Sequence, residues 1–457
     1  MTDEPAPPSP DDPFGGLPPE LRQMLEALGG SQMFQQLGAM VRGSAGTGPV
    51  NWDLAGQVAR QLAAPGDRAP TEDERDRAEE AHRLAEHWLD EGSLPAPPDA
   101  GLLIVASRQD WVAAALDGLA PMVEPVAEAS TNAMAELAAS QMDELGLGDV
   151  LGQLGGGADI RAMMTPMGAM LTGTHAGQVI GQLARQLVGQ YELGVPTAPR
   201  SQAFHIAVNV TDAFEGYDLD LREVAIVLAL HEGAHRRLYH AVPWLTGHVH
   251  GLVWQFAEAT EVDPDELMRM SQDLMIGVDP EDPESLEQAI SKAGEFRLEP
   301  TQVQQRILQR VQGVVTLVQA WARSEVQRAA EPRLGASLGR IEEVLRRRRA
   351  SHGDGEQLLA QLLGLDLKPD DETVGDRFVE VVEAAAGPDA LREALAHPEN
   401  LPDATELADP QRWLSRIRGE GDEADGAVPA DLSSLLDAGD APTELSAEER
   451  RRDREGD

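Results

Sequence analysis

An uninterrupted apolar run over residues 224–230 leads directly into His231 and His235, with Glu232 between them. Seven apolar residues in a row are typical of a helix that is buried on all sides. Residues four apart lie on one face of a helix, so both imidazoles would point the same way. A polar ring inside a protein is costly unless something binds it. The chain must therefore fold so that the two histidines of a core helix find metal or hydrogen-bond partners.

The spacing of His231, Glu232 and His235 favours a metal ion as that partner. Two imidazoles one helical turn apart can bind the same zinc ion, and the adjacent carboxylate can accept a proton from a water on that ion. The alternative is a pair of hydrogen-bonded core histidines beside an exposed glutamate. Because the motif continues a core helix, we expect one zinc ion bound by His231 and His235.

Composition and pattern predict a mainly α fold. Hydrophobic residues make up 42% of the chain and aromatic residues only 4%, so the core must be built from small aliphatic side chains, which suits helix packing. The alternation of apolar residues over 203–210 predicts one strand close to the metal helix. We therefore expect a multi-helix fold with a small β element next to that helix.

Capping residues and prolines set the expected helix bounds. Asp220 and Glu223 form a capping-box pattern ahead of a helix over about 221–240. Small residues recur every four positions from Ala169 to Gly181, which favours close packing of another helix. The other expected helices run from Thr71 to about Asp90, from Gln109 to Leu119, from just after Pro125, from Asp263-Pro264, from Asp282-Pro283 and from Thr301 to Ala330.

Charge and cysteine content limit the partners and the compartment. There are 79 acidic and 37 basic residues, for a net charge of -42, which disfavours binding to nucleic acid or to anionic membranes. The uncharged stretch 162–184 is long enough to span a bilayer but too polar to do so. The chain has no cysteine and its N-terminus lacks the pattern of a signal peptide, so we expect a cytoplasmic protein.

Several segments resemble one family. The stretch LALHEGAHRRLYHAVPWL is similar to the metal-binding segment of the type 2 zincin-like metallopeptidases, which are common in actinobacteria and were long catalogued as a domain of unknown function. The resemblance continues outside this stretch and covers about residues 108–417. The other matching segments are SRQDWVAAALDGLAPMVEP, IGQLARQLVGQYELGVP, RIEEVLRRRRA, LLGLDLKPDDETVGDRFVEVV and LADPQRWLSRI.

The resemblance implies a zincin-like fold and suggests domain limits. We expect a disordered tail over 1–19, an N-terminal helical region over 20–98 and a zincin-like metallopeptidase domain over 99–418. An acidic and mostly disordered tail, with one short helix around 432–436, would follow over 419–457. A proline-rich stretch at 94–99 reads as the linker before the main domain.

Spacing alone does not identify the third zinc ligand. A third histidine six residues after His235 would define the metzincin pattern, but that position is Ala241. A glutamate about twenty residues after His235 would be thermolysin-like, and there Gln255 is found, with Glu258 three residues further on. Glu258 is thus a possible ligand, although an acid on a helix is more often exposed.

The resemblance points to another third-ligand position. In the family, a long downstream helix carries a glutamate followed by glycine and an aromatic residue, which looks like the third-ligand position. Here Gln319 and Ala320 stand where the glutamate and glycine would be. An amide is a poorer zinc ligand than a carboxylate. Gln319 could bind weakly, Glu325 or Glu258 could replace it, or the site could have lost its metal.

An active site of this kind would hydrolyse an amide bond in a peptide or protein substrate. His231 and His235 would hold zinc, and Glu232 would take a proton from the bound water and pass it to the leaving amine. His240 or Tyr239 could stabilise the oxyanion, although ordinary packing is the simpler role for both. The alternatives are an inactive zincin-fold interaction module and a helical scaffold with a chance motif. The sequence does not indicate the oligomeric state.

Two further patterns carry weaker expectations. His248 and His250 form a pair that could bind metal, but hydrogen-bonded or exposed side chains are the simpler interpretation. The arginine run 346–349 follows Glu342 and Glu343. We expect this run to close a helix at its C-terminus and to pair with acidic residues.

Overall fold

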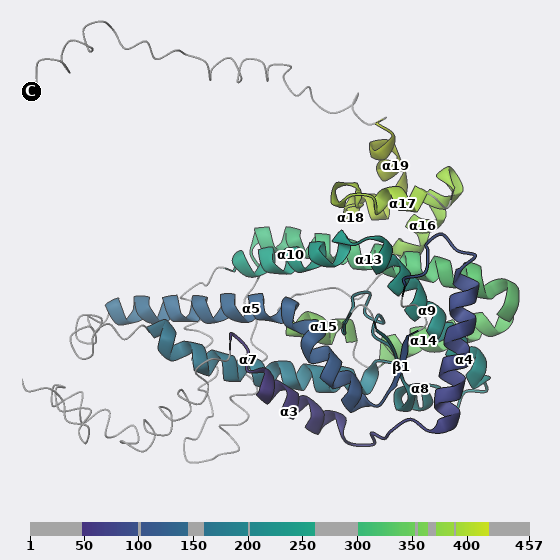
Figure 1. Ribbon diagram of the computed structural model, residues 1–457. Helices are drawn as coiled ribbons and strands as arrows, with labels where there is room; N and C mark the ends of the chain where they lie inside the picture. Colours follow the sequence, from purple (N-terminus) through teal and green to yellow (C-terminus); the bar gives the residue numbers. More distant parts are fainter. Residues whose placement is uncertain are drawn as a thin grey trace, which may run out of the picture. The chain divides into compact units, whose positions relative to one another are not determined.

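Helices surround one short sheet in the computed structural model, which describes residues 48–98, 102–144, 160–199, 202–260, 300–351, 355–363, 372–387 and 390–419 (Figure 1). The sheet consists of strands β1 (Leu103–Ala106) and β2 (Ala203–Ile206), which pair in parallel. Strand β2 contacts the helix that carries the two histidines, so a mainly α fold with a small β element beside that helix is confirmed.

The helices follow in chain order. They are α3 (Trp52–Ala63), α4 (Glu72–Leu89), α5 (Arg108–Glu144), α7 (Ile160–Gln186), α8 (Ala207–Phe214), α9 (Leu221–Ala241), α10 (Trp244–Glu258), α13 (Gln302–Leu334), α14 (Ala336–Ser351), α15 (Gly355–Leu362), α16 (Glu372–Ala386), α17 (Ala390–Ala394), the 3-10 helix η1 (Pro398–Asn400), α18 (Ala404–Ala408) and α19 (Pro410–Arg418). The described residues up to Pro410 form one compact unit, and a second begins at Gln411. Across the described ranges, we find no helix with the length and hydropathy needed to cross a membrane.

Side-chain caps fix the start of the expected helices. Thr71 begins α4 and Thr301 begins α13, each through a complete capping box, and Asp220 caps α9 by accepting a hydrogen bond from the backbone N–H of Arg222 at 2.8 Å. Each cap satisfies a backbone N–H that the first helical turn leaves without a partner. The predicted starts of these three helices are confirmed.

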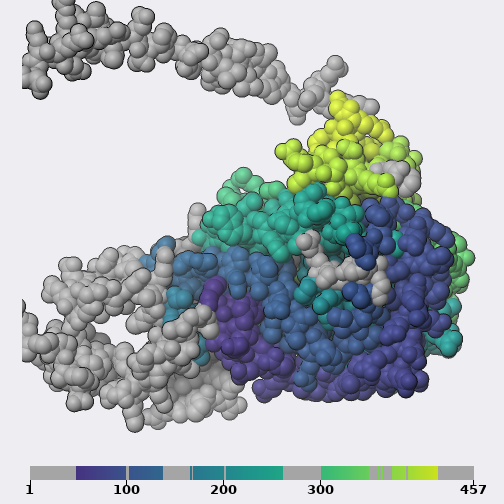
Figure 2. Space-filling view, in the orientation of Figure 1, coloured from purple at the N-terminus to yellow at the C-terminus, as the bar shows by residue number. Residues whose placement is uncertain are grey.

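Pro121 and Pro125 lie inside a continuous helix, α5, and do not separate two helices as the sequence predicted. A proline inside a helix removes one backbone hydrogen bond and costs about 3 kcal/mol in isolation. Helix α5 packs against α3, α7 and α10, and this tertiary packing outweighs the local cost. Figure 2 shows the surfaces of α5, in blue, and α10, in teal, next to each other on one face.

The strand predicted over 203–210 is only half as long in the structure. Strand β2 ends at Ile206 and helix α8 begins at Ala207. Every residue from 203 to 210 is buried, so the apolar pattern could not distinguish the two kinds of structure. Asn209 belongs to the helix, where its side-chain amide donates to the carbonyls of Ala184 and Leu187 at 2.8 and 2.6 Å.

The small residues of α7 form the contact surface for α3, as the sequence predicted. A Cβ on Gly173 would lie 2.5 Å from the carbonyl oxygen of Asn51, and one on Gly177 would lie 2.6 Å from that of Ala55. Both distances are far inside van der Waals contact. Glycine therefore allows the two helix backbones to approach this closely.

Helix α9 lies against α4, α13 and α14. Arg237, which is 2% exposed, connects α9 to α4. Its guanidinium donates to the carboxylates of Glu86 and Asp90 at 2.7 and 2.8 Å and to the carbonyl of Leu89 at 3.0 Å. A buried arginine is stable only when its donors are satisfied in this way. The residue two positions after His235 thus anchors the helix that carries the two histidines.

Some expected segments lie outside the described residues. They are the tail over 1–19, the segment 420–457 with its short helix around 432–436, and the helices expected after Asp263-Pro264 and Asp282-Pro283. The division between an N-terminal region and a main domain at residues 98 and 99 stays a prediction.

Candidate functional site

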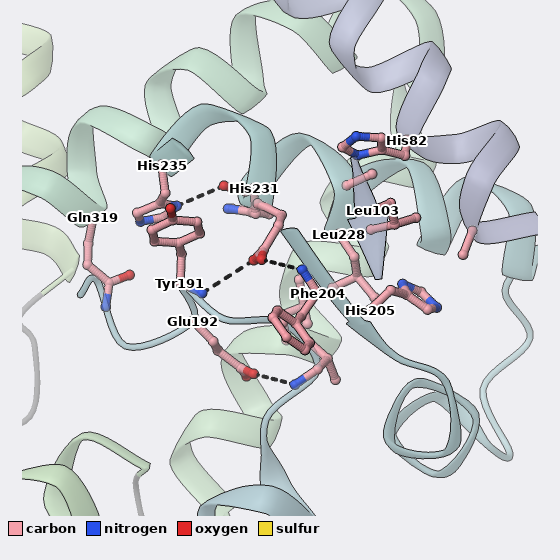
Figure 3. Close-up of a pocket in the computed structure, with 16 residues that line it drawn as sticks. His82, Leu103, Tyr191, Glu192, Phe204, His205, Leu228, His231, His235 and Gln319 are labelled. Carbon is pink, nitrogen blue, oxygen red and sulfur yellow. Dashed lines mark hydrogen bonds between the residues drawn. The ribbon is translucent and has the colours of Figure 1, made fainter. Parts of the chain in front are cut away.

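A pocket beside α9 contains the residues of the sequence motif. It is lined by His231, Glu232 and His235 from α9, together with Gln319 from α13 (Figure 3). Its cavity volume is about 50 Å³, enough for a few water molecules or an ion but not for a peptide. The other lining residues are Ala78, His82, Leu103, Val188, Gly189, Tyr191, Glu192, Phe204, His205, Leu228, Ala229 and Leu345.

The ring of His235 is held in one tautomer. Its Nδ1 lies 2.8 Å from the backbone carbonyl of His231, and a carbonyl can only accept, so Nδ1 carries the proton. The ring also stacks on Tyr191, with centroids 5.9 Å apart and planes 9° apart. In the neutral ring the lone pair is then on Nε2, the atom that faces away from the helix backbone. This arrangement is common where a histidine binds a metal.

His231 contacts a carboxylate that the sequence did not point to. Its Nε2–H donates to Oε1 of Glu342 at 2.8 Å, and the two side chains are 18% and 19% exposed. Glu342 lies on α14, which packs against α9. From the sequence, the basic run behind Glu342 was expected to close a helix and to pair with acidic residues. Such pairs do form between Glu343 and two arginines, Arg346 and Arg347.

Glu232 is deeply buried and held by backbone donors. Phe204 N–H donates to Oε1 at 2.9 Å, and Gln190 N–H lies 3.1 Å from both carboxylate oxygens. Burial raises the pKa of Glu232 to about 7, against the opposing effect of these backbone donors. A Cβ on Gly189 would lie 2.6 Å from Oε2, so glycine is needed where the loop meets the carboxylate.

Gln319 lines the pocket, as the resemblance implied, and is 5% exposed. Its side chain lies against Gly194, whose φ of +72° favours glycine. A Cβ at Gly194 would come within 2.9 Å of Gln319 Cγ and 3.3 Å of its Nε2. Tyr239 is buried nearby, and its hydroxyl donates to the Gly194 carbonyl at 2.6 Å, which is a packing role.

The remaining candidates lie away from the two histidines. Glu325 accepts hydrogen bonds from the hydroxyl of Ser93 at 2.9 Å and from Arg328. Glu258 lines a different cavity, and His240 is exposed at the end of α9. His248 contacts the edge of Trp244, and burial together with the nearby Arg310 lowers its pKa. The positive charge of Arg310 would oppose a cation at this position.

Helix α14 forms a wall of the site through residues spaced three apart. Glu342 contacts His231, Leu345 lines the pocket, and Arg348 donates to Glu192 at 3.0 Å. Glu192 in turn accepts from the backbone N–H of Val188 at 2.8 Å, which fixes the loop beside the pocket. Sequence reasoning did not identify this face. The three-residue spacing from Glu342 into the basic run 346–349 was the available signal.

The donor atoms suit a zinc ion in kind. Two imidazoles and a carboxylate are a common ligand set for catalytic zinc, and His235 is already in a tautomer that leaves Nε2 for the metal. His231 would have to give up its Nε2 proton, as is usual when a metal binds. Within the described ranges, no three histidine, aspartate, glutamate or cysteine side chains are already arranged to hold an ion.

Comparisons with known proteins give a family and a fold for the chain. The family model described as "Zincin-like metallopeptidase" matches residues 50–414. Among solved structures, a protein from Chloroflexus aurantiacus described as a "putative hydrolase with a novel fold" has a TM-score of 0.54 and 22% sequence identity. The match covers 81% of this chain and 100% of that one, and at this identity it shows a shared fold. No curated protein matches the chain.

Proposed function

This chain belongs to the zincin-like metallopeptidase family, and from that membership we propose that it is a zinc-dependent hydrolase, most simply a peptidase. The observation that carries the proposal is the pocket in which His231, Glu232 and His235 meet. Family membership implies a metal, and these residues supply the donors and the base that such a metal site needs.

We propose that His231 and His235 hold one zinc ion through their Nε2 atoms. The carbonyl of His231 fixes the Nδ1 proton of His235, and Tyr191 fixes the ring plane. Both constraints reduce the conformational entropy that binding would otherwise cost. When bound, zinc supplies a Lewis acid that polarises a carbonyl and lowers the pKa of a coordinated water to about 7.

Glu232 is our candidate for the general base. Its carboxylate lines the same pocket as the two imidazoles, and burial raises its pKa to about 7. A base with a pKa near the working pH can both take a proton and give it back. The backbone N–H groups of Phe204 and Gln190 hold the carboxylate while it does so. Glu232 would then deliver the proton to the leaving amine.

The substrate class follows from the family and from the size of the pocket. A peptidase family suggests a peptide or protein substrate. A cavity of about 50 Å³ cannot enclose a peptide, so the cleaved bond would lie at its mouth with the chain running outside. This arrangement would suit extended segments of a substrate better than a folded surface.

Two measurements test the proposed function. Tag-free protein should contain about one zinc ion per chain by elemental analysis, and His231→Ala should remove it. Glu232→Gln should keep zinc but lower cleavage of a peptide library by about 100-fold or more, the usual range for a lost general base. A folded wild type without metal would reject the proposal. Equal cleavage by wild type and Glu232→Gln would show that the cleavage comes from a contaminant.

One observation favours a second candidate, an inactive zincin-fold protein that acts as an interaction module. Gln319 stands where the family resemblance implies a carboxylate. His231 forms a hydrogen bond to Glu342 through the nitrogen that would otherwise bind a metal. If that pair had replaced the metal, the wild type would be folded, metal-free and inactive. The zinc measurement therefore separates the two candidates.

A further inference from the structure

We propose that Glu342, and not Gln319, is the third protein ligand of the metal. This inference rests on the proposed function, because it concerns the same ion. It adds a residue from α14, a helix that the sequence motif does not include. The metal would then be held by two histidines of α9 and one carboxylate that lies 111 residues after His231.

The contact between Glu342 and His231 is the first argument. Oε1 of Glu342 lies 2.8 Å from Nε2 of His231, the imidazole atom proposed to bind the ion. Zinc ligands lie about 2.0–2.2 Å from the ion, so two donors of one tetrahedral site are about 3.3 Å apart. A carboxylate at hydrogen-bond distance is thus within about half an ångström of the spacing that two ligands need.

The chemistry of the donors is the second argument. Two neutral imidazoles and an amide would leave the full double charge of zinc in a partly buried pocket. A carboxylate halves that charge and is a preferred zinc ligand, whereas an amide oxygen is not. Gln319 is also packed against Gly194, whose added Cβ would come within 3.3 Å of its Nε2. Its amide therefore already packs against Gly194.

Burial separates Glu342 from its neighbour on α14. Glu343 is 41% exposed and pairs with Arg346 and Arg347 at 2.8 and 2.6 Å on the surface of the helix. Glu342 is 19% exposed and contacts His231, across the interface between α14 and α9. The two adjacent glutamates thus have different partners. Glu343 therefore provides a matched control with the same side chain and the same charge.

Glu342 could instead only orient His231 as a hydrogen-bond acceptor, and two substitutions separate these roles. Glu342→Gln keeps an acceptor oxygen at the same distance from the backbone but is a poor zinc ligand. Glu342→His is a good zinc ligand but replaces the carboxylate acceptor. A ligand role predicts that histidine preserves zinc binding and glutamine does not, and an orienting role predicts the reverse.

The experiment is a zinc titration of the full-length, tag-free, metal-stripped chain against a competing chelator, with unfolding followed in parallel to confirm that each variant is folded. Wild type, Glu342→Gln, Glu342→His, Gln319→Ala and Glu343→Gln are compared. We expect Glu342→Gln to weaken zinc binding more than 100-fold, beyond the 10–100-fold typical of residues that only orient a ligand. Glu342→His should stay within about tenfold of wild type, and Gln319→Ala and Glu343→Gln within about threefold.

Cobalt substitution adds a readout of the coordination sphere itself. The visible absorption of bound Co²⁺ should change between wild type and Glu342→His, because one ligand atom changes from oxygen to nitrogen, and should stay unchanged in Gln319→Ala and Glu343→Gln. Zinc binding by the wild type that Gln319→Ala abolishes and Glu342→Gln leaves intact would overturn the inference while the proposed function stands. A wild type that binds no zinc would reject both.

Discussion

Burial acts in opposite directions on two ionisable side chains that line the same pocket. Glu232 is an acid, so burial raises its pKa to about 7, although backbone N–H donors hold its ionised form. His205 is a base, so burial lowers its pKa to about 4, with a further lowering by Arg77 and an opposing effect of Glu74. Both groups are therefore neutral over a wider pH range than in water.

His205 should make the protein less stable as the pH falls. Its folded pKa of about 4 is below the ordinary value of 6.5, so between these values the unfolded chain binds a proton that the folded chain does not. Stability is therefore complete above pH 6.5 and is lost towards pH 4, by up to about 3 kcal/mol from this residue.

Urea unfolding of wild type and His205→Gln at pH 7.5, 6 and 5 would measure this effect. Glutamine does not titrate, so the variant should lose less free energy of unfolding than the wild type over this range. The comparison uses the slope with pH, which removes any constant cost of the substitution. Parallel slopes in the two proteins would contradict the buried, neutral state of His205.

A glycine inside a helix of this fold can allow close packing of a neighbouring helix or have no packing role, depending on its position. Gly177 in α7 faces the backbone of α3, and its missing Cβ would lie 2.6 Å from the Ala55 carbonyl oxygen. Gly251 in α10 is also inside a helix, but an added Cβ there would meet nothing within 4 Å. The same residue type in the same kind of element thus serves packing in one place and only lowers helix propensity in the other.

Substitution of each glycine by alanine should therefore change stability in opposite directions. Gly177→Ala should destabilise by about 1–3 kcal/mol, because backbone atoms of α3 have to move away. Gly251→Ala should stabilise by about 0.5–1 kcal/mol, because alanine loses less backbone entropy in a helix. Urea unfolding at constant pH measures both. Equal effects of the two substitutions would mean that α7 and α3 do not pack as described.

The sequence predicted the start of a helix best where a side chain close by in the chain caps that helix. The caps at Thr71, Asp220 and Thr301 each act within three residues, and all three helix starts were predicted. The end of β2 at Ile206 was not, since a segment buried on every side has no distinguishing period. Nor was the continuity of α5 through Pro121, which depends on packing between helices that are distant in sequence.

The residues of the candidate site also fall into those that a local motif predicts and those that depend on tertiary packing. His231, Glu232 and His235 form one local motif, and the structure places all three at one pocket, together with Gln319 from the resemblance. Glu342 could not be found locally, because its contact with His231 spans 111 residues and depends on how α14 packs on α9. The acids proposed as alternatives, Glu258 and Glu325, have positions that only the tertiary structure determines.

At the scale of the molecule, the proposed metal would connect elements far apart in the sequence. Helix α9 contacts α4, α13 and α14, and Arg237 and His231 lie on parts of it that face different neighbours. An ion that binds the folded chain and not the unfolded chain stabilises all of these contacts together. Stability should therefore depend on the free zinc concentration.

Zinc should raise the free energy of unfolding of the wild type by about 2.7 kcal/mol when its free concentration is one hundred times the dissociation constant. Urea unfolding of metal-stripped protein, with and without buffered zinc, measures this shift. His231→Ala should show little or none of it, because one of the two imidazoles is gone while the Arg237 anchor of α9 remains. Removal of zinc by a chelator should return the wild type to its metal-free value. An equal shift in the variant would place the stabilising zinc at some other site, since only a site that uses His231 links the ion to the interface between α9 and α14.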